Sequence, residues 1–181
     1  MTQPAHAVWH SLDEYAALEA HSNVRHEYLD GRIYAMAGGT PEHAARAALV
    51  LFALVGATRG GPCKAYSSDL SVRVAATGLV TYPDAAIVCP PVLRDTTVTN
   101  AVLNPAVLVE VLSPSTAAYD RGDKLSHYQR IPSLREIGLV DHASPRIEVL
   151  RRVEGVWTSV VAGPGERLTL DTVLAVDELF A

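Results

Sequence analysis

A carboxylate inside an aliphatic run is the most unusual chemical feature of this sequence. Glu110 lies within residues 106–112, and the other six positions are alanine, valine or leucine. Such a run is typical of a strand that is buried on both faces of a sheet. An unpaired ionised carboxylate there costs several kcal/mol, so the fold must supply a cation, hydrogen bonds or a proton.

A second acid has a similar setting earlier in the chain. Asp84 stands in the apolar stretch 82–88, 26 residues before Glu110. Two apolar strands that each carry one acid indicate that the two side chains meet. Carboxylates that meet in a dry place raise each other's pKa unless a metal ion keeps them ionised. The pair therefore predicts a divalent-cation site.

Composition places the chain among globular proteins. Its 181 residues are 49% hydrophobic and 19% charged, which predicts a single domain over residues 1–181. The net charge of −5 argues against an avid nucleic-acid binder, although six Arg and Lys residues fall within the first 73 positions. Cys63 and Cys89 fit no metal or disulfide spacing, so we expect reduced thiols.

No segment predicts a membrane or a secretory route. The longest apolar run, residues 47–56, is too short to span a bilayer, and the first residues lack the basic and apolar regions of a signal peptide. We therefore expect a cytoplasmic protein.

Capping residues and turn signals predict a mixed α/β order. Helices are expected over residues 12–20 and 41–58 and between Ser113 and Pro132. Strands are expected over 26–36 around an Asp-Gly turn, 65–75, 79–88, 106–112, 137–140 and 146–161, with a loop at 89–104 and a partly helical end at 173–180. This order favours a mixed sheet flanked by helices.

The skeleton of the PD-(D/E)XK nuclease motif is present as Pro83-Asp84 followed by the strand of Glu110. Matching segments occur in order at 26–31, 68–74, 82–84, 109–116, 120–128, 131–136 and 140–141. Over nearly its whole length the chain thus resembles the Uma family of restriction endonucleases in that superfamily. The resemblance implies a restriction-endonuclease-like α/β fold and a metal-dependent endonuclease that hydrolyses DNA.

The same resemblance implies a set of metal ligands. Asp84 and Glu110 would bind Mg²⁺, with Mn²⁺ as an alternative, together with the backbone carbonyl of Val111. Glu27 matches the family's early acidic residue and is a further ligand or a water-orienting group. Its other interpretation is a surface residue on a hairpin, and for Asp84 and Glu110 the alternatives are a strand cap and an ion pair at a sheet edge.

The lysine of the superfamily motif is absent from its usual position in this chain. The motif requires Lys two residues after the acid, where this sequence has Leu112. In the family that it resembles the lysine comes from the following helix, which makes Lys124 the candidate. Asp120, Lys124 and Tyr128 are spaced at i, i+4 and i+8, so one helical face could return the lysine to Glu110. Lys124 would position or deprotonate the attacking water, or else be an ordinary solvated lysine.

Other residue types are weaker candidates. Asp69 follows a serine at the start of a strand, where turn capping explains it, and His43 in a first helical turn is better explained by capping than by phosphate contact.

Three interpretations of function follow from these residues. The first is a DNA endonuclease that acts as a homodimer, since cutting two strands needs two sites. The second is a non-catalytic nucleic-acid-binding or structural domain that retains the nuclease fold, which Leu112 and the acidic net charge favour. The third is a nuclease for RNA or branched DNA.

Overall fold

The computed structural model describes residues 8–36, 38–141, 144–170, 172–175 and 179. The helical segments are α1 (Leu12–Glu19), α2 (Pro41–Thr58), α3 (Ala117–Tyr119), the π-helical turn η1 (Asp120–Lys124) and α4 (Leu125–Tyr128). The strands are β1 (His26–Leu29), β2 (Arg32–Ala35), β3 (Lys64–Ser67), β4 (Ser71–Arg73), β5 (Val80–Thr81), β6 (Ala85–Val88), β7 (Ala101–Val102), β8 (Pro105–Leu112), β9 (Glu136–Asp141), β10 (Ile147–Val153), β11 (Val156–Ala162), β12 (Arg167–Leu170) and β13 (Thr172–Ala175).

A six-stranded sheet forms the larger layer, in the order β11-β10-β9-β8-β6-β3. Its β8 and β9 are parallel and are joined by the helical segment α3-η1-α4, while the other neighbours are antiparallel. Every residue of β8 is buried, as its aliphatic sequence predicts for a central strand. The strand that carries Glu110 therefore runs through the middle of the fold.

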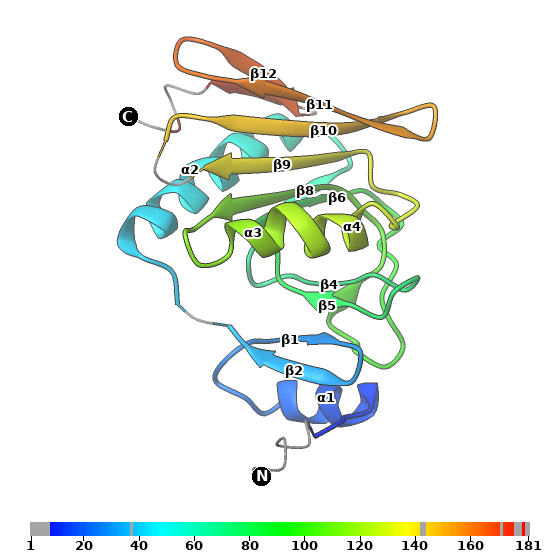
Figure 1. The fold of residues 1–181 in the computed structure, drawn as a ribbon. Helices are drawn as coiled ribbons and strands as arrows, with labels where there is room; N and C mark the ends of the chain where they lie inside the picture. The colour runs from blue at the N-terminus through cyan, green and yellow to red at the C-terminus, as the bar shows by residue number, and fades with distance from the viewer. Residues whose placement is uncertain (1–7, 37, 142–143, 171, 176–178, 180–181) are drawn as a thin grey trace.

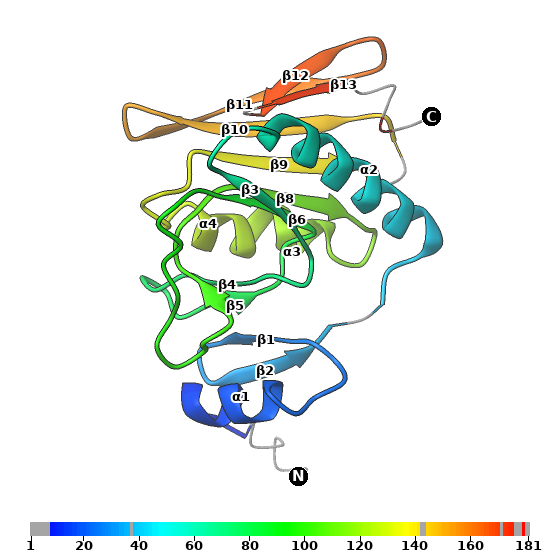
Figure 2. The same cartoon turned by 180° about the vertical axis from the view of Figure 1, so that it is seen from behind.

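Helices cover both faces of this sheet, as Figures 1 and 2 show from opposite sides. Val50 and Leu54 of α2 pack on the face that carries Val107, Val109 and Val111. On the other face, residues of β8, β9 and α4 form a second apolar cluster that includes Leu108, Leu112, Tyr128, Ile137 and Leu139. Side chains alternate along a strand, so Glu110 shares the second face with Leu108 and Leu112. The expected α/β architecture, a mixed sheet flanked by helices, is confirmed.

A second sheet lies on the N-terminal side, in the order β2-β1-β5-β4-β7. The capping box of Ser11 and Glu14 opens α1, as the sequence predicts. The expected turn at Asp30 and Gly31 joins β1 and β2, and both residues have positive φ. Tyr15 and Tyr28 pack ring against ring and fix α1 to this sheet.

The cysteine prediction is wrong. Cys63 and Cys89 form a disulfide. Lys64 pairs with Val88 in the antiparallel register of β3 and β6, so the two cysteines are the next pair along. The register of β3 and β6 brings the two cysteines together, and this pairing cannot be predicted from their spacing in the sequence.

The C-terminal prediction is wrong in part. A helix was expected within 173–180, but residues 172–175 form β13, which pairs with β12 in a two-stranded hairpin. Residues 176–178 and 180 lie outside the described residues. In the part of the chain that is described, no helix is long and apolar enough to cross a bilayer.

Candidate active site

A buried lysine forms the centre of the candidate site. The Nζ atom of Lys124 lies 2.9 Å from Glu110 Oε1, 3.3 Å from Glu27 Oε1 and 3.4 Å from Asp120 Oδ1. The Lys124 side chain is only 6% exposed. Burial of a charge on this scale requires partners of opposite sign, and three carboxylates provide them. Lys124 comes from η1, so a helical segment and not the β8 strand delivers the cation.

The π-helical turn is the local feature that carries Lys124. Regular α-helix precedes and follows Asp120–Lys124, and such single π turns inside helices are frequent at functional sites. Asp120 is 5% exposed and forms an ion pair with Lys124 at the i, i+4 spacing that the sequence displays. Sequence reasoning placed Asp120 on the same face but assigned it no role, and its spacing from Lys124 was the available signal.

Two side chains, those of Tyr128 and Lys124, contact the same oxygen of Glu110. The hydroxyl of Tyr128 donates to Glu110 Oε1, the atom that also contacts Lys124. Burial raises the pKa of Glu110 to about 8, and the charges of Asp84 and Asp120 add to this, while Lys124 and the Tyr128 hydroxyl oppose it. In the metal-free protein, ionisation of Glu110 is therefore unfavourable.

Lys124 itself remains an ammonium. Burial lowers its pKa, but the carboxylates around it, Glu110 first and then Glu27 and Asp120, outweigh burial and raise the pKa well above its ordinary value. When all three carboxylates are ionised, one ammonium faces three negative charges and leaves two uncompensated. A further cation would stabilise this arrangement.

Asp84 meets β8 beside Glu110. Ala85 pairs with Val109 in the antiparallel register of β6 and β8, so Asp84 is the next residue along and lies opposite Glu110. Its Oδ2 accepts a hydrogen bond from the backbone N–H of Val111 at 2.7 Å. The Asp84 carboxylate thus accepts the Val111 N–H just beyond the last backbone pair between β6 and β8.

His43 reaches the same point from the opposite face of the sheet. It stands in the first turn of α2, and its Nε2 lies 3.4 Å from Asp84 Oδ2. The contact with Asp84 raises the pKa of His43 against the opposing effect of burial, and the backbone of Val111 raises it further. Sequence reasoning favoured capping for this residue.

Glu27 joins the site from the second sheet. It lies on β1, and the hydroxyl of Thr81 on the neighbouring β5 donates to its Oε1. The same oxygen contacts Lys124, so Lys124 bridges Glu27 of one sheet and Glu110 of the other. Thr81 is a site residue that sequence reasoning missed, since a threonine at a strand end gives no distinctive signal.

Two further residues discussed from sequence lie apart from this cluster. Asp69 is exposed in the turn after β3 and pairs with Arg25 and with Ser67. Leu112 is buried in the apolar cluster that includes Tyr128 and Leu108. The position of the motif lysine is therefore filled by a packing residue.

The donor set has the chemistry of a site for a hard divalent cation. Asp84, Glu110, Glu27 and the Val111 carbonyl offer the oxygen ligands that Mg²⁺ prefers. Among the described residues no hydrogen bond reaches Asp84 Oδ1 or Glu110 Oε2. In that same part of the chain no three acidic, histidine or cysteine side chains already converge enough to hold an ion. The donor types fit a metal, and ion binding requires these side chains to close in.

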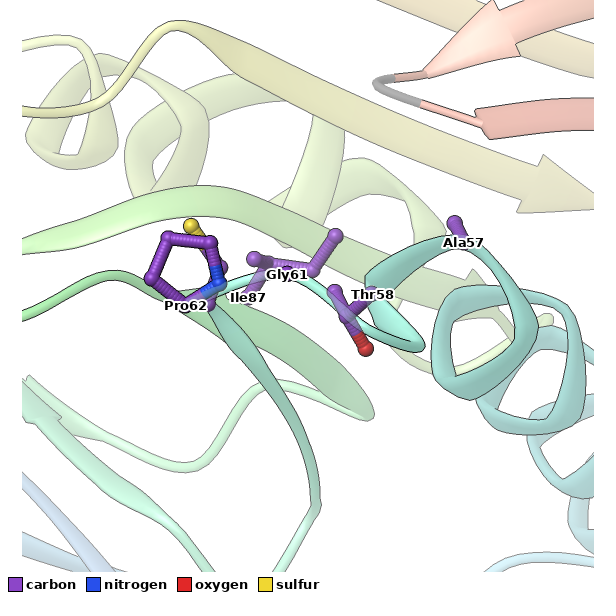
Figure 3. Close-up of a pocket in the computed structure, with 6 residues that line it drawn as sticks. Ala57, Thr58, Gly61, Pro62 and Ile87 are labelled. Carbon is purple, nitrogen blue, oxygen red and sulfur yellow. The ribbon is translucent and has the colours of Figure 1, made fainter.

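A pocket elsewhere on the molecule has a different character. It is lined by Ala57, Thr58, Gly61, Pro62, Cys63 and Ile87, with a volume of about 140 Å³ (Figure 3). It adjoins the last turn of α2, about 20 Å along the helix from His43. No ionisable side chain lines it, so it lacks the groups for the chemistry of the carboxylate cluster.

Comparisons with known proteins give one consistent result. The family model Uma2, described as "Putative restriction endonuclease", matches residues 12–179. Two proteins of Synechocystis sp. are similar in sequence: slr1290, with 35% identity over 94% of this chain and 90% of its own length, and sll1609, with 30% identity over 77% and 79%. A crystal structure from Anabaena variabilis, titled a "putative nuclease belonging to DUF820", has a TM-score of 0.74 at 17% identity and covers 94% of this chain and 97% of its own.

Proposed function

This chain belongs to the Uma2 family, and on that basis we propose that it is a metal-dependent endonuclease that hydrolyses DNA phosphodiester bonds. The observation that carries the proposal is the buried Lys124 ammonium, which contacts both Glu110 and Glu27 beside Asp84. A purely structural role explains such a costly cluster poorly, because buried ion pairs are often no more stable than apolar replacements.

In this proposal Asp84, Glu110, Glu27 and the Val111 carbonyl hold Mg²⁺, with Mn²⁺ as an alternative. When bound, the ion offsets the charge that develops on the phosphate and lowers the pKa of a bound water. Lys124 orients the attacking water and offsets phosphate charge. Because its pKa is raised, it acts through its positive charge and not as a base that removes a proton.

The test is a cleavage assay on supercoiled plasmid, linear duplex, branched and single-stranded DNA, and on RNA, each with Mg²⁺, Mn²⁺ or EDTA. We expect metal-dependent cleavage of duplex DNA, lost in Lys124→Ala and retained in Lys64→Ala. Lys64 is the matched control because it lies exposed on the edge strand β3. Cleavage of RNA or branched DNA alone would redirect the substrate assignment, and no cleavage of any substrate would contradict the proposed activity.

A second candidate function is a nucleic-acid-binding or structural domain without activity. Leu112 at the usual lysine position and the net charge of −5 favour it. It predicts that the wild type cleaves nothing and that Lys124→Ala changes no functional property.

We also propose a homodimer and a cytoplasmic location. Two sites are needed to cut both strands of a duplex, and light scattering in the presence and absence of DNA tests the dimer. The Cys63–Cys89 disulfide counts against the cytoplasm, because disulfides are rare there. Cell fractionation decides this point.

A further inference from the structure

The position of the His43 ring is not explained by the helix end on which it stands. The cap of α2 is made by Thr40, whose side chain accepts from the backbone N–H of His43. The imidazole takes no part in that bond. It extends into the fold instead, and its side chain is only 18% exposed.

The two groups that the imidazole contacts are both proposed metal ligands. Its Nε2 lies 3.4 Å from Asp84 Oδ2, and the Val111 backbone is near enough to the ring to raise the pKa of His43. Asp84 and Val111 are themselves joined by a hydrogen bond of 2.7 Å. One imidazole nitrogen therefore faces the place where a carboxylate and a backbone carbonyl would meet an ion.

We infer that His43 supplies a nitrogen ligand to the divalent ion of this site, so that the site prefers Mn²⁺ over Mg²⁺. The inference rests on the proposed function and deepens it. Mg²⁺ binds oxygen ligands and dehydrates reluctantly, whereas imidazole is a ligand for first-row transition metals. Mn²⁺ also accepts the carboxylate and carbonyl oxygens that Asp84, Glu110 and Val111 offer.

Two other histidines of the described residues, His26 and His21, lie elsewhere. The ring of His26 lies 2.9 Å from Glu19 Oε2, in the N-terminal part of the molecule. His21 is exposed just beyond the end of α1. His21→Ala is therefore a matched control that removes an imidazole without touching the site.

The decisive measurement is pulsed electron paramagnetic resonance of Mn²⁺ bound to the purified protein, without nucleic acid. A coordinated imidazole gives a ¹⁴N modulation on the Mn²⁺ signal. We expect this modulation in the wild type and in His21→Ala, and its loss in His43→Ala and in His43→Asp. In His43→Asp an oxygen ligand replaces the nitrogen, so Mn²⁺ still binds.

Calorimetric titrations supply a second readout that does not depend on cleavage. We expect His43→Ala to weaken Mn²⁺ binding by at least about 10- to 100-fold, the loss seen when groups that only orient a ligand are removed. Mg²⁺ affinity changes less. His43→Asp shifts the preference from Mn²⁺ toward Mg²⁺, and circular dichroism checks that each variant is folded.

The outcomes separate the two proposals. Bound Mn²⁺ without ¹⁴N modulation in the wild type overturns the role of His43 and leaves the oxygen-ligated nuclease site intact. Modulation that survives in His43→Ala assigns the nitrogen elsewhere and also overturns the inference. If the wild type binds neither Mn²⁺ nor Mg²⁺, the metal site itself is contradicted and the inference falls with it.

Discussion

Lys124 Nζ lies 2.9 Å from Glu110 Oε1, and neither side chain is more than 6% exposed. The two residues come from the strand β8 and from the π-helical turn η1, which follows β8 after the short helix α3. In the superfamily motif a lysine on the strand itself would occupy this role. Here that position on the strand is Leu112, which packs in the apolar cluster. Lys124 of η1 instead places an ammonium on the same face of the sheet.

The first prediction concerns catalysis by Lys124. In the proposed mechanism Lys124→Ala removes the charge that orients water and faces the phosphate, so we expect the cleavage rate to fall by about 10²–10³, the usual span for removal of one group that stabilises transition-state charge. Single-turnover cleavage of plasmid DNA at saturating metal measures this.

Lys124→Arg and Lys64→Ala are the controls for this prediction. The planar guanidinium keeps the charge but cannot occupy the position of a compact ammonium among three carboxylates, so we expect partial activity at most. Lys64→Ala should cleave normally. Full activity in Lys124→Ala would show that the buried cation is only structural.

The second prediction concerns the two strand acids. Asp84→Asn and Glu110→Gln should abolish divalent-ion binding, measured by calorimetry, and leave the fold intact. Asparagine retains an oxygen that can accept from the Val111 N–H. Glutamine cannot ionise, so it keeps this buried position neutral at every pH, while Glu27 and Asp120 still compensate Lys124.

Without metal, the melting temperatures of these variants should equal or exceed that of the wild type. For Asp84→Asn the reason is the repulsion relieved when one negative charge leaves the cluster, and for Glu110→Gln it is that the amide stays neutral at a pH where the buried carboxyl would ionise. A marked drop in melting temperature for both variants would favour a structural ion pair over a metal site.

The third prediction is a pH dependence of stability in the metal-free protein. The pKa of Glu110 rises from its ordinary 4.5 to about 8 in the folded state. Between these values the folded protein holds a proton that the unfolded chain has released, so stability falls as pH rises. Urea unfolding from pH 4.5 to 9 should show this decline, and it should level off above about pH 8.

Glu110→Gln isolates the contribution of this carboxyl. The raised pKa of His43 acts in the same direction, because its stabilising proton is also lost as pH rises. The variant should therefore keep a smaller slope than the wild type. Equal slopes in the two proteins would assign the pH dependence to other groups.

The fourth prediction concerns the disulfide. Cys63 and Cys89 close a loop across 26 positions, which corresponds to about 3.5 kcal/mol of stability from restriction of the unfolded chain. The double Cys→Ala variant should lose about this much in urea unfolding. Its cleavage rate should match the wild type, since the bond adjoins the far end of α2 from His43. Two free thiols in protein purified without reductant would contradict the disulfide.

Much of the fold could be predicted from local sequence. The aliphatic run around Glu110 predicts a central strand, and the capping residues Ser11 and Thr40 predict the starts of α1 and α2. The disulfide could not be predicted, because it depends on the pairing of β3 with β6, which are distant in the sequence. The strand β13 could not be predicted either, because it forms by pairing with β12 and its own sequence has no clear strand pattern.

The candidate site divides in the same way. Glu110 is conspicuous in sequence because a charge in an apolar strand is costly, and the spacing of Asp120 and Lys124 indicates one helical face. The contact between His43 and Asp84 depends on how α2 packs across the sheet, and that between Thr81 and Glu27 on the pairing of β1 with β5. No periodicity in the sequence encodes either contact. The metal and catalytic roles of Asp84, Glu110, Val111, Glu27 and Lys124 stay predictions.

The contacts of Lys124 with Glu27 and Glu110 also connect the two sheets. One ammonium joins the two sheets through two ion pairs, beside the apolar cluster in which Val72 of β4 packs with Leu108 and Leu112 of β8. In the proposed function, a phosphate that attracts Lys124 would weaken one of these two ion pairs. In the proposed function, DNA binding and the contact between the two sheets are therefore linked through Lys124, and the Thr81 hydroxyl, which donates to Glu27, holds the carboxylate on the second sheet.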